Sequence, residues 1–194
     1  RPQDDKFPKP SETVVATCVK RDSMFFAAFA VGKWNKATLR LMFNKFEDYV
    51  QQPTSKNKLE IYSDGNDDYR TVLPEYFHKD SLCYGQKIKS KDGKKIFPAI
   101  KRKIFGNPNQ DEIETNTNEC FNTILRNRMS RLVRKTQGIT KEKYALNNAL
   151  FLFQFYWNFI YQREKNVTPA ILEKQTDKVW TWGMFLHAKL RDTN

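Results

Sequence analysis

The segment from Lys143 to Tyr161 constrains the fold of this chain more than any other stretch of its sequence. As a helix it would be apolar on nearly all sides, because apolar residues fill positions 149–153, 155–157 and 159–160. Gln154 and Asn158 interrupt the run, which is also shorter than the roughly 20 residues that a membrane-spanning helix needs. We therefore predict a central packing helix, and we expect no membrane partner.

The N-terminal part of the sequence predicts a β-hairpin covered by an amphipathic helix. Residues 13–19 are apolar and β-branched, residues 24–31 form a second apolar run, and a short polar link at 20–23 joins the two. Between positions 35 and 49 apolar residues recur at helical spacing, and Asn35 is a suitable N-cap. We expect this helix to pack on the hairpin.

Asp64 is expected at the C-terminal end of a strand. A short strand at 59–62 runs directly into the turn residues at 63–66, and a short helix at 69–73 would end before Pro74. Residues 85–118 are polar and basic. They predict mostly loop, or an irregular pair of basic strands, as an insert between the acids Asp64 and Glu119.

Glu119 begins the next predicted helix, which extends to Lys135. Its apolar residues form one stripe, and at about 100° per residue Glu119, Asn122 and Arg126 share a face beside that stripe. Residues 168–194 predict a short helix and an aromatic clamp that close the domain. The order of elements predicts a single α/β domain of the α+β kind over residues 1–194, with helices flanking a mixed sheet.

The charge balance favours nucleic acid as a partner. The chain has 34 Lys and Arg against 22 Asp and Glu, a net charge of +12, which is typical of proteins that bind phosphates. Three widely spaced cysteines without a C-x-x-C pair argue against a disulfide framework or a zinc ribbon. Because there are only two histidines, a metal site would consist of carboxylates, which suit Mg²⁺ or Mn²⁺.

Acids at the ends of separate elements are what two-metal cleavage of a phosphodiester requires. Asp64 at a strand end and Glu119 at a helix start are the best placed. A first acid would come from a strand that precedes the hairpin, which leaves Asp4 or Asp5, with Asp22 in the hairpin link as a weaker candidate. Asp64 could instead be a turn residue, and Glu119 could simply be an acid favoured by the helix dipole.

Several segments resemble the catalytic domain of insertion-sequence-one-type DDE transposases, and together they cover nearly the whole chain. The similarity is strongest from Glu119 onward, where an Asn three residues on and an Arg seven residues on follow in the family's order. The front of the chain departs from the family, because an Asp-Glu pair is usual there and Asp4–Asp5 stands in its place. The similar segments are Ile61–Asn66, Glu119–Arg128, Arg131–Thr136, Asn158–Ile160 and Thr168–Ala170.

The resemblance implies an RNase H-like, retroviral-integrase-like fold that nicks transposon ends and transfers the freed 3′-hydroxyl into target DNA. It also implies two Mg²⁺ or Mn²⁺ ions, no organic cofactor, and a homo-oligomer on DNA. Asp64, Glu119 and Asp4, or Asp5 in its place, would hold the metal. Asn122 would orient metal or phosphate, and the basic residues of the helix would contact DNA: Arg126, Arg128, Arg131, Arg134 and Lys135.

Two other functions remain open at this point. The chain could be a non-catalytic nucleic-acid-binding remnant or a domesticated transposase, or an RNase H-like nuclease that only cuts. It begins at Arg1 without an apolar leader, so we expect a piece of a longer protein that lacks the upstream DNA reader. We expect a cytoplasmic, nucleoid-associated location in a prokaryote, and no secretion.

Overall fold

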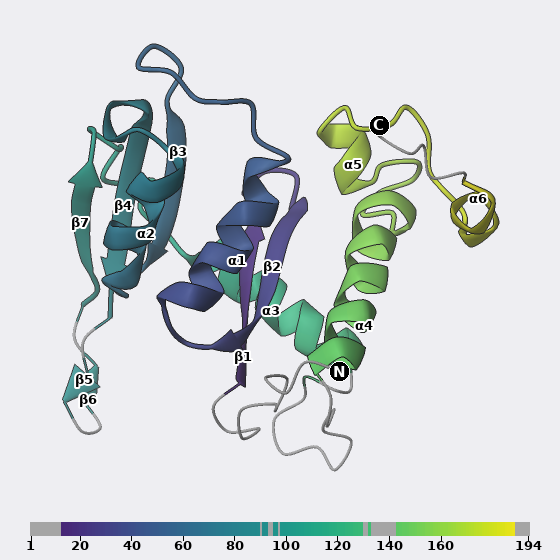
Figure 1. Ribbon diagram of the computed structural model, residues 1–194, viewed down its shortest axis with the longest axis horizontal. Coiled ribbons are helices and arrows are strands. Elements are labelled where there is room, and N and C mark those ends of the chain that lie inside the picture. The colour runs from purple at the N-terminus through teal and green to yellow at the C-terminus, as the bar shows by residue number, and fades with distance from the viewer. Residues whose placement is uncertain are drawn as a thin grey trace.

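The structure is a computed structural model that describes residues 13–89, 91–92, 95–96, 98–129, 132 and 143–188. Figure 1 shows its arrangement. Its strands are β1 (Thr13–Val19), β2 (Phe26–Lys33), β3 (Leu59–Asp64), β4 (Leu82–Ile88), β5 (Lys91–Asp92), β6 (Lys95–Ile96) and β7 (Ile100–Phe105). Its helices are α1 (Lys36–Glu47), α2 (Asp68–Tyr76), η1 (Lys79–Ser81), α3 (Asn116–Arg128), α4 (Lys143–Phe155), η3 (Tyr156–Ile160), α5 (Pro169–Leu172) and α6 (Trp182–His187).

The predicted hairpin and its covering helix are confirmed. β1 pairs antiparallel with β2 from Thr13 opposite Lys33 onward, with one irregularity after Cys18. α1 begins after Asn35, whose side chain accepts a hydrogen bond from the Thr38 amide at 3.1 Å and so satisfies one free donor of the first turn. Its apolar face packs on β2 and carries five buried residues: Thr38, Leu39, Met42, Phe43 and Phe46.

A second sheet lies beside the hairpin and has the order β3-β4-β7. β3 and β4 are parallel, and β4 and β7 are antiparallel, so the sheet is mixed. Residues 85–118 are therefore not mostly loop: the alternative of a basic strand pair is correct, with β4 beginning at Leu82. The loop interpretation was wrong because β4 is buried through Leu82, Tyr84 and the polar Gln86, which the local sequence does not mark as a strand.

Two helix ends differ from the prediction. α2 continues through Pro74 to Tyr76, because Pro74 removes only the hydrogen bond to the carbonyl of Arg70, a residue on the exposed side of the helix. α3 ends at Arg128 rather than Lys135, since Met129 has extended backbone (φ −117°, ψ 98°). Residues 130–131 and 133–142 lie outside the described part of the chain.

The helix predicted at 143–161 is present as α4 and η3, but it does not lie at the centre. One face packs on β2 and α3 through Leu146, Leu150, Phe153 and Trp157. Its other face carries Tyr144, Phe151 and Leu152, which are 70%, 49% and 49% exposed. The helix is apolar on nearly all sides, yet it lies at the periphery with one apolar side exposed. The prediction of a central position was therefore wrong.

Polar side chains of this helix complete the edge of β2. Asn158 is buried, accepts from the Phe26 amide at 2.9 Å and donates to the Phe26 carbonyl at 3.0 Å. Gln154 donates to the carbonyls of Phe26 and Ala27. The two residues that interrupt the apolar run therefore supply the hydrogen bonds that a neighbouring strand would otherwise make.

The C-terminal aromatic clamp is also seen. Phe155 contacts Phe159, Trp180 and Phe185, with ring centroids 5.1, 5.7 and 4.2 Å apart.

The described chain is a mixed α/β structure with flanking helices, as predicted. Within the described residues, no helix is both long and apolar enough to cross a membrane.

Replacing Asn158 with Leu is expected to lower the free energy of unfolding by about 1–3 kcal/mol, because the buried Phe26 amide loses its acceptor. Asn148→Leu on the exposed side of the same helix is the matched control, expected within about 0.5 kcal/mol of the wild type. Urea unfolding followed by circular dichroism measures both. Equal losses in the two variants would contradict a structural role for the Asn158 hydrogen bonds.

Candidate active site

A cleft of about 1590 Å³ separates the two sheets and runs between the facing strands β1 and β3. The residues of both strands line it along their whole lengths. β1 pairs with β2 and β3 pairs with β4, and neither has a second partner strand within the described residues. Arg21 reaches across the cleft from the hairpin turn, with its guanidinium 4.8 Å from the centre of the Tyr62 ring.

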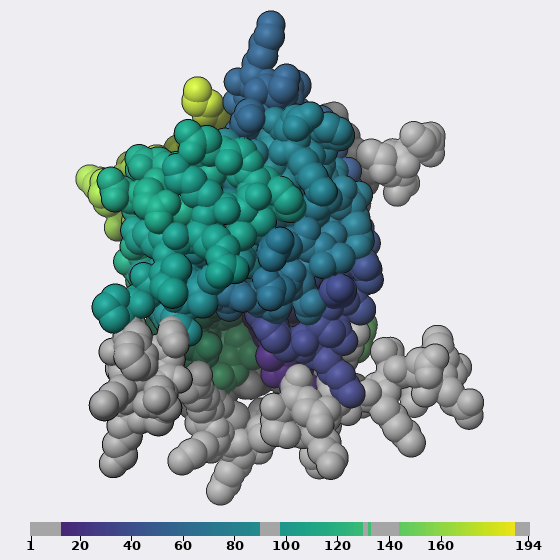
Figure 2. Space-filling model, turned by 90° about the vertical axis from the view of Figure 1, so that its left-hand side faces the viewer, coloured from purple at the N-terminus to yellow at the C-terminus, as the bar shows by residue number. Residues whose placement is uncertain are grey.

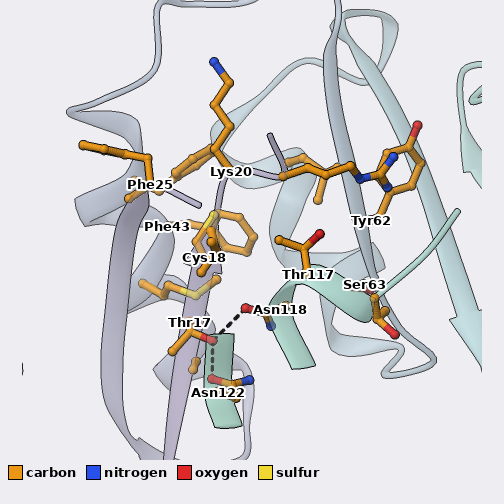
Figure 3. A pocket seen from close by; sticks show the side chains of 18 of the residues that line it. Thr17, Cys18, Lys20, Phe25, Phe43, Tyr62, Ser63, Thr117, Asn118 and Asn122 are labelled. Atoms are coloured by element: carbon orange, nitrogen blue, oxygen red, sulfur yellow. Dashed lines mark hydrogen bonds between the residues drawn. The ribbon is translucent and has the colours of Figure 1, made fainter. Parts of the chain in front are cut away.

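The two walls of the cleft differ in chemistry (Figure 3). Cys18 of β1 lies on the side of Phe43 from α1, and burial raises the pKa of its thiol to about 12, so the thiol is not a nucleophile at neutral pH. Thr17 points the other way, toward α3, where its hydroxyl lies 3.0 Å from the side-chain oxygens of both Asn118 and Asn122. One wall is therefore apolar and the other polar.

A smaller cavity of about 440 Å³ brings the two best-placed acids together, and both also line the cleft. Asp64 is the last residue of β3 and Glu119 lies in the first turn of α3. The remaining lining residues come from the turn after β3 and the end of β4: Gly65, Asn66, Lys87, Ile88 and Lys89.

Gly65 permits the close approach of these two segments. A Cβ atom at this position would lie 3.0 Å from Cγ1 of Ile88 and 3.3 Å from its Cα, which is tighter than ordinary contact. The turn after Asp64 therefore packs directly against the end of β4 and places the acid beside the lysines of that strand. In the β3–β4 ladder, Asp64 stands opposite Lys87.

Glu119 is held by two donors. The ammonium group of Lys89 and the hydroxyl of Thr115 each lie 2.6 Å from its Oε1. The hydrogen bond from Lys89, followed by that from Thr115, lowers the pKa of the Glu119 carboxyl, so it is ionised at neutral pH. Asp64 is exposed, and its Oδ1 accepts from the Asn66 amide at 3.3 Å.

Glu114 anchors the segment that leads into α3. Its carboxylate pairs with Lys87 of β4 and, at 2.8 Å, with Lys101 of β7. Hydrogen bonds from Lys101 and Lys87 lower the pKa of Glu114 to about 2. This clamp fixes the start of α3, and with it Glu119, against the second sheet.

The residues predicted to contact DNA do not all lie in the same surroundings. Asn122 and Arg126 line the cleft with Glu119, which confirms their shared face. Arg128 instead lies over the Tyr161 ring at 4.3 Å and donates to the Tyr156 hydroxyl at 3.2 Å, so aromatic residues at the start of η3 and directly after its end hold it. Arg131, Arg134 and Lys135 lie outside the described residues.

A metal ion could be held here by Asp64 and Glu119, whose hard carboxylate oxygens suit Mg²⁺ or Mn²⁺. Asp4 and Asp5, the candidates for the first ligand, are not among the described residues. Within the described part of the chain, no group of three or more His, Cys, Asp or Glu residues is gathered for metal binding. Asp22 lies in the hairpin turn and does not line the cavity that the two acids share.

Sequence reasoning missed the roles of Lys87, Lys89 and Lys101. Their spacing is the only local signal: Lys87 lies in β4 and Lys89 directly follows its last residue, two positions along the chain. Lys101 belongs to β7, a strand on the side of the molecule that faces the viewer in Figure 2. Which acid each lysine meets depends on the tertiary fold.

Comparison with models of protein families, with curated proteins and with solved structures found no match to this chain. Its function therefore has to be inferred from the cleft, the paired acids and the surrounding charge.

Glu114→Gln is expected to destabilise the protein at pH 7, by about 1 kcal/mol for a partly exposed clamp. Because the pKa of Glu114 is lowered in the folded state, its stabilisation is complete above pH 4.5 and is lost as the pH falls toward about 2. The stability difference from the wild type should therefore shrink over that range in urea unfolding. A difference that stays constant down to pH 2 would exclude the ion-pair contribution.

Proposed function

We propose that this chain is the catalytic domain of a metal-dependent polynucleotidyl transferase. The observation that carries the proposal is that Asp64 and Glu119, which lie 55 positions apart on different elements, line one cavity that opens beside a long cleft. The net charge of +12 supports a nucleic-acid substrate.

The particular protein that we propose is a DDE transposase of the insertion-sequence-one type. The supporting residues are Asp64 at its strand end, Glu119 in the first turn of α3, and Asn122 and Arg126 on the same helix face. The family's activity is cleavage at transposon ends followed by attack of the freed 3′-hydroxyl on target DNA. A homo-oligomer on paired DNA ends belongs to the same proposal.

An RNase H-like fold is the finer architecture that we propose. Its support is the open cleft between β1 and β3, which has a strand edge on each side, an apolar wall toward α1 and a polar wall toward α3. An extended segment with alternating apolar and polar side chains would match both walls and pair with both edges. In the RNase H-like architecture that we propose, such a segment would join the two sheets.

Each residue of the site would then have a defined task. Bound Mg²⁺ or Mn²⁺ would activate the attacking oxygen and stabilise the leaving oxygen. Asp64 and Glu119 would hold the metal through their carboxylate oxygens. Arg126 would bind a backbone phosphate along α3, while Asn122, tied to Thr17 of β1, would keep the helix in place.

Asp64→Asn and Glu119→Gln are each expected to reduce metal-dependent nicking of end-containing DNA by on the order of 100-fold or more, because even residues that only orient metal ligands change activity by roughly 10–100-fold. Asp67→Asn is the matched control: it removes an exposed acid three residues from Asp64 that does not line the cavity, and it should nick like the wild type. Gel assays with Mg²⁺ and Mn²⁺ measure all four proteins.

The same assay distinguishes the alternatives. Nicking without joining of the 3′-end to target DNA would favour a simple nuclease. DNA binding that is unchanged by Glu119→Gln, without metal-dependent cleavage in any protein, would favour a non-catalytic binding module and sink the proposal.

Hydrogen exchange tests the proposed architecture without reference to catalysis. If a strand pairs with both edges of the cleft, alternate amides of β1 and β3 that point into it should exchange slowly in the full chain. The outer edge of β7, which has no partner strand among the described residues, provides the internal control for fast exchange. Exchange of the cleft amides as fast as those of β7 would rule out a joining strand.

A further inference from the structure

Lys89 occupies the place next to Glu119 where a bound cation would be expected. It extends from the end of β4 into the small cavity, and its ammonium group lies 2.6 Å from Oε1 of Glu119. Asp64 and Lys87 line the same cavity, but Lys87 pairs with Glu114, so the ammonium group of Lys89 is the one that pairs with a carboxylate of the proposed metal site.

The ion pair of Lys89 differs from that of its neighbour Lys87. Lys87 is 15% exposed, and its partner Glu114 is also bound by Lys101, so three charged groups from β4, β7 and the segment before α3 hold one another. Lys89 and Glu119 form a pair of which each side chain is about half exposed, at 52% and 51%. Such exposed pairs contribute little stability and exchange partners readily.

A divalent ion on Glu119 and an ammonium group at 2.6 Å from the same oxygen repel each other, so the two compete for the carboxylate. The flexible four-carbon stem of lysine allows the ammonium group to leave the carboxylate without any movement of β4. The nearest chemically suitable partner for the released charge would be a phosphate oxygen of the nucleic acid whose backbone the metal contacts.

We propose that Lys89 is a positioning residue that exchanges between Glu119 in the metal-free protein and a DNA phosphate in the metal-loaded protein. The inference rests on the proposed function, because it assumes that Glu119 holds a metal ion. It assigns Lys89 two effects of opposite sign: it weakens metal binding in the absence of DNA and strengthens DNA binding in the presence of metal.

The test uses Lys89→Met, which keeps the length of the side chain and removes its charge. Lys103→Met of β7 is the matched control, because it removes an equal charge that pairs with the side-chain oxygen of Asn107 at 2.7 Å and belongs neither to the Glu114 clamp nor to the small cavity. Manganese affinity, measured by electron paramagnetic resonance without DNA, should increase about fivefold in Lys89→Met, since an exposed ion pair no longer competes. Lys103→Met should bind manganese like the wild type.

A second measurement follows the other partner of the exchange. For a random DNA duplex, the slope of log affinity against log salt should fall by about one unit in Lys89→Met when Mn²⁺ is present, and should not change when it is absent. This pattern identifies a phosphate contact that forms only after the metal displaces Lys89 from Glu119.

The failure of this inference can be separated from failure of the proposed function by including Glu119→Gln. If Glu119→Gln weakens manganese binding while Lys89→Met leaves it unchanged, the metal site stands and the exchange is refuted. If Lys103→Met tightens manganese binding as much as Lys89→Met, general charge is responsible and the exchange is again refuted. If the wild type binds no manganese, both the proposed function and the exchange of Lys89 are refuted.

Discussion

Burial of β2 on both faces is the constraint on which the rest of the structure depends. Phe26, Phe29 and Val31 project into the core formed with α3 and α4, whereas Ala28 and Ala30 project into the core formed with α1. A strand buried on both faces separates two apolar cores and must be covered by helices on each side. The side chains that face α1 are small alanines. The phenylalanine rings of Phe26 and Phe29 fill the space between β2 and the helices α3 and α4. The position of α3, and hence of Glu119, follows from this packing through Phe121 and Leu125.

Elements with a strong local pattern could be predicted from the sequence. The hairpin and α1 follow from apolar runs, a polar link and the Asn35 cap, all of which act over a few residues. The helix at 143–161 was placed correctly but assigned the wrong environment, because periodicity reports which side chains are apolar and does not report which neighbours are available to cover them. The sequence left loop and strand open for β4 for a similar reason: its buried Gln86 donates to the Asn66 carbonyl, a partner that only the tertiary fold supplies.

The same contrast between local sequence signals and tertiary partners applies to the candidate site. The positions of Asp64 at a strand end and Glu119 near a helix start could be predicted, because element ends are visible in a sequence; their role as metal ligands stays a prediction. The lysines around them were not found, because an ion pair such as Lys89 with Glu119 joins residues 30 positions apart and leaves no periodic trace. The expected first acid, Asp4 or Asp5, remains a prediction from the sequence, since neither lies within the described residues.

The register of the β3–β4 pair has a consequence for how such a site can change over evolutionary time. Because Asp64 stands opposite Lys87 in a parallel ladder, sliding one strand by a residue would turn every side chain of that strand to the opposite face. The charge environment of the acid can therefore not be adjusted gradually by shifting the backbone. It can change only through replacement of one lysine at a time. The loops at the edges of the sheet can vary in length without changing the register that places Asp64 opposite Lys87.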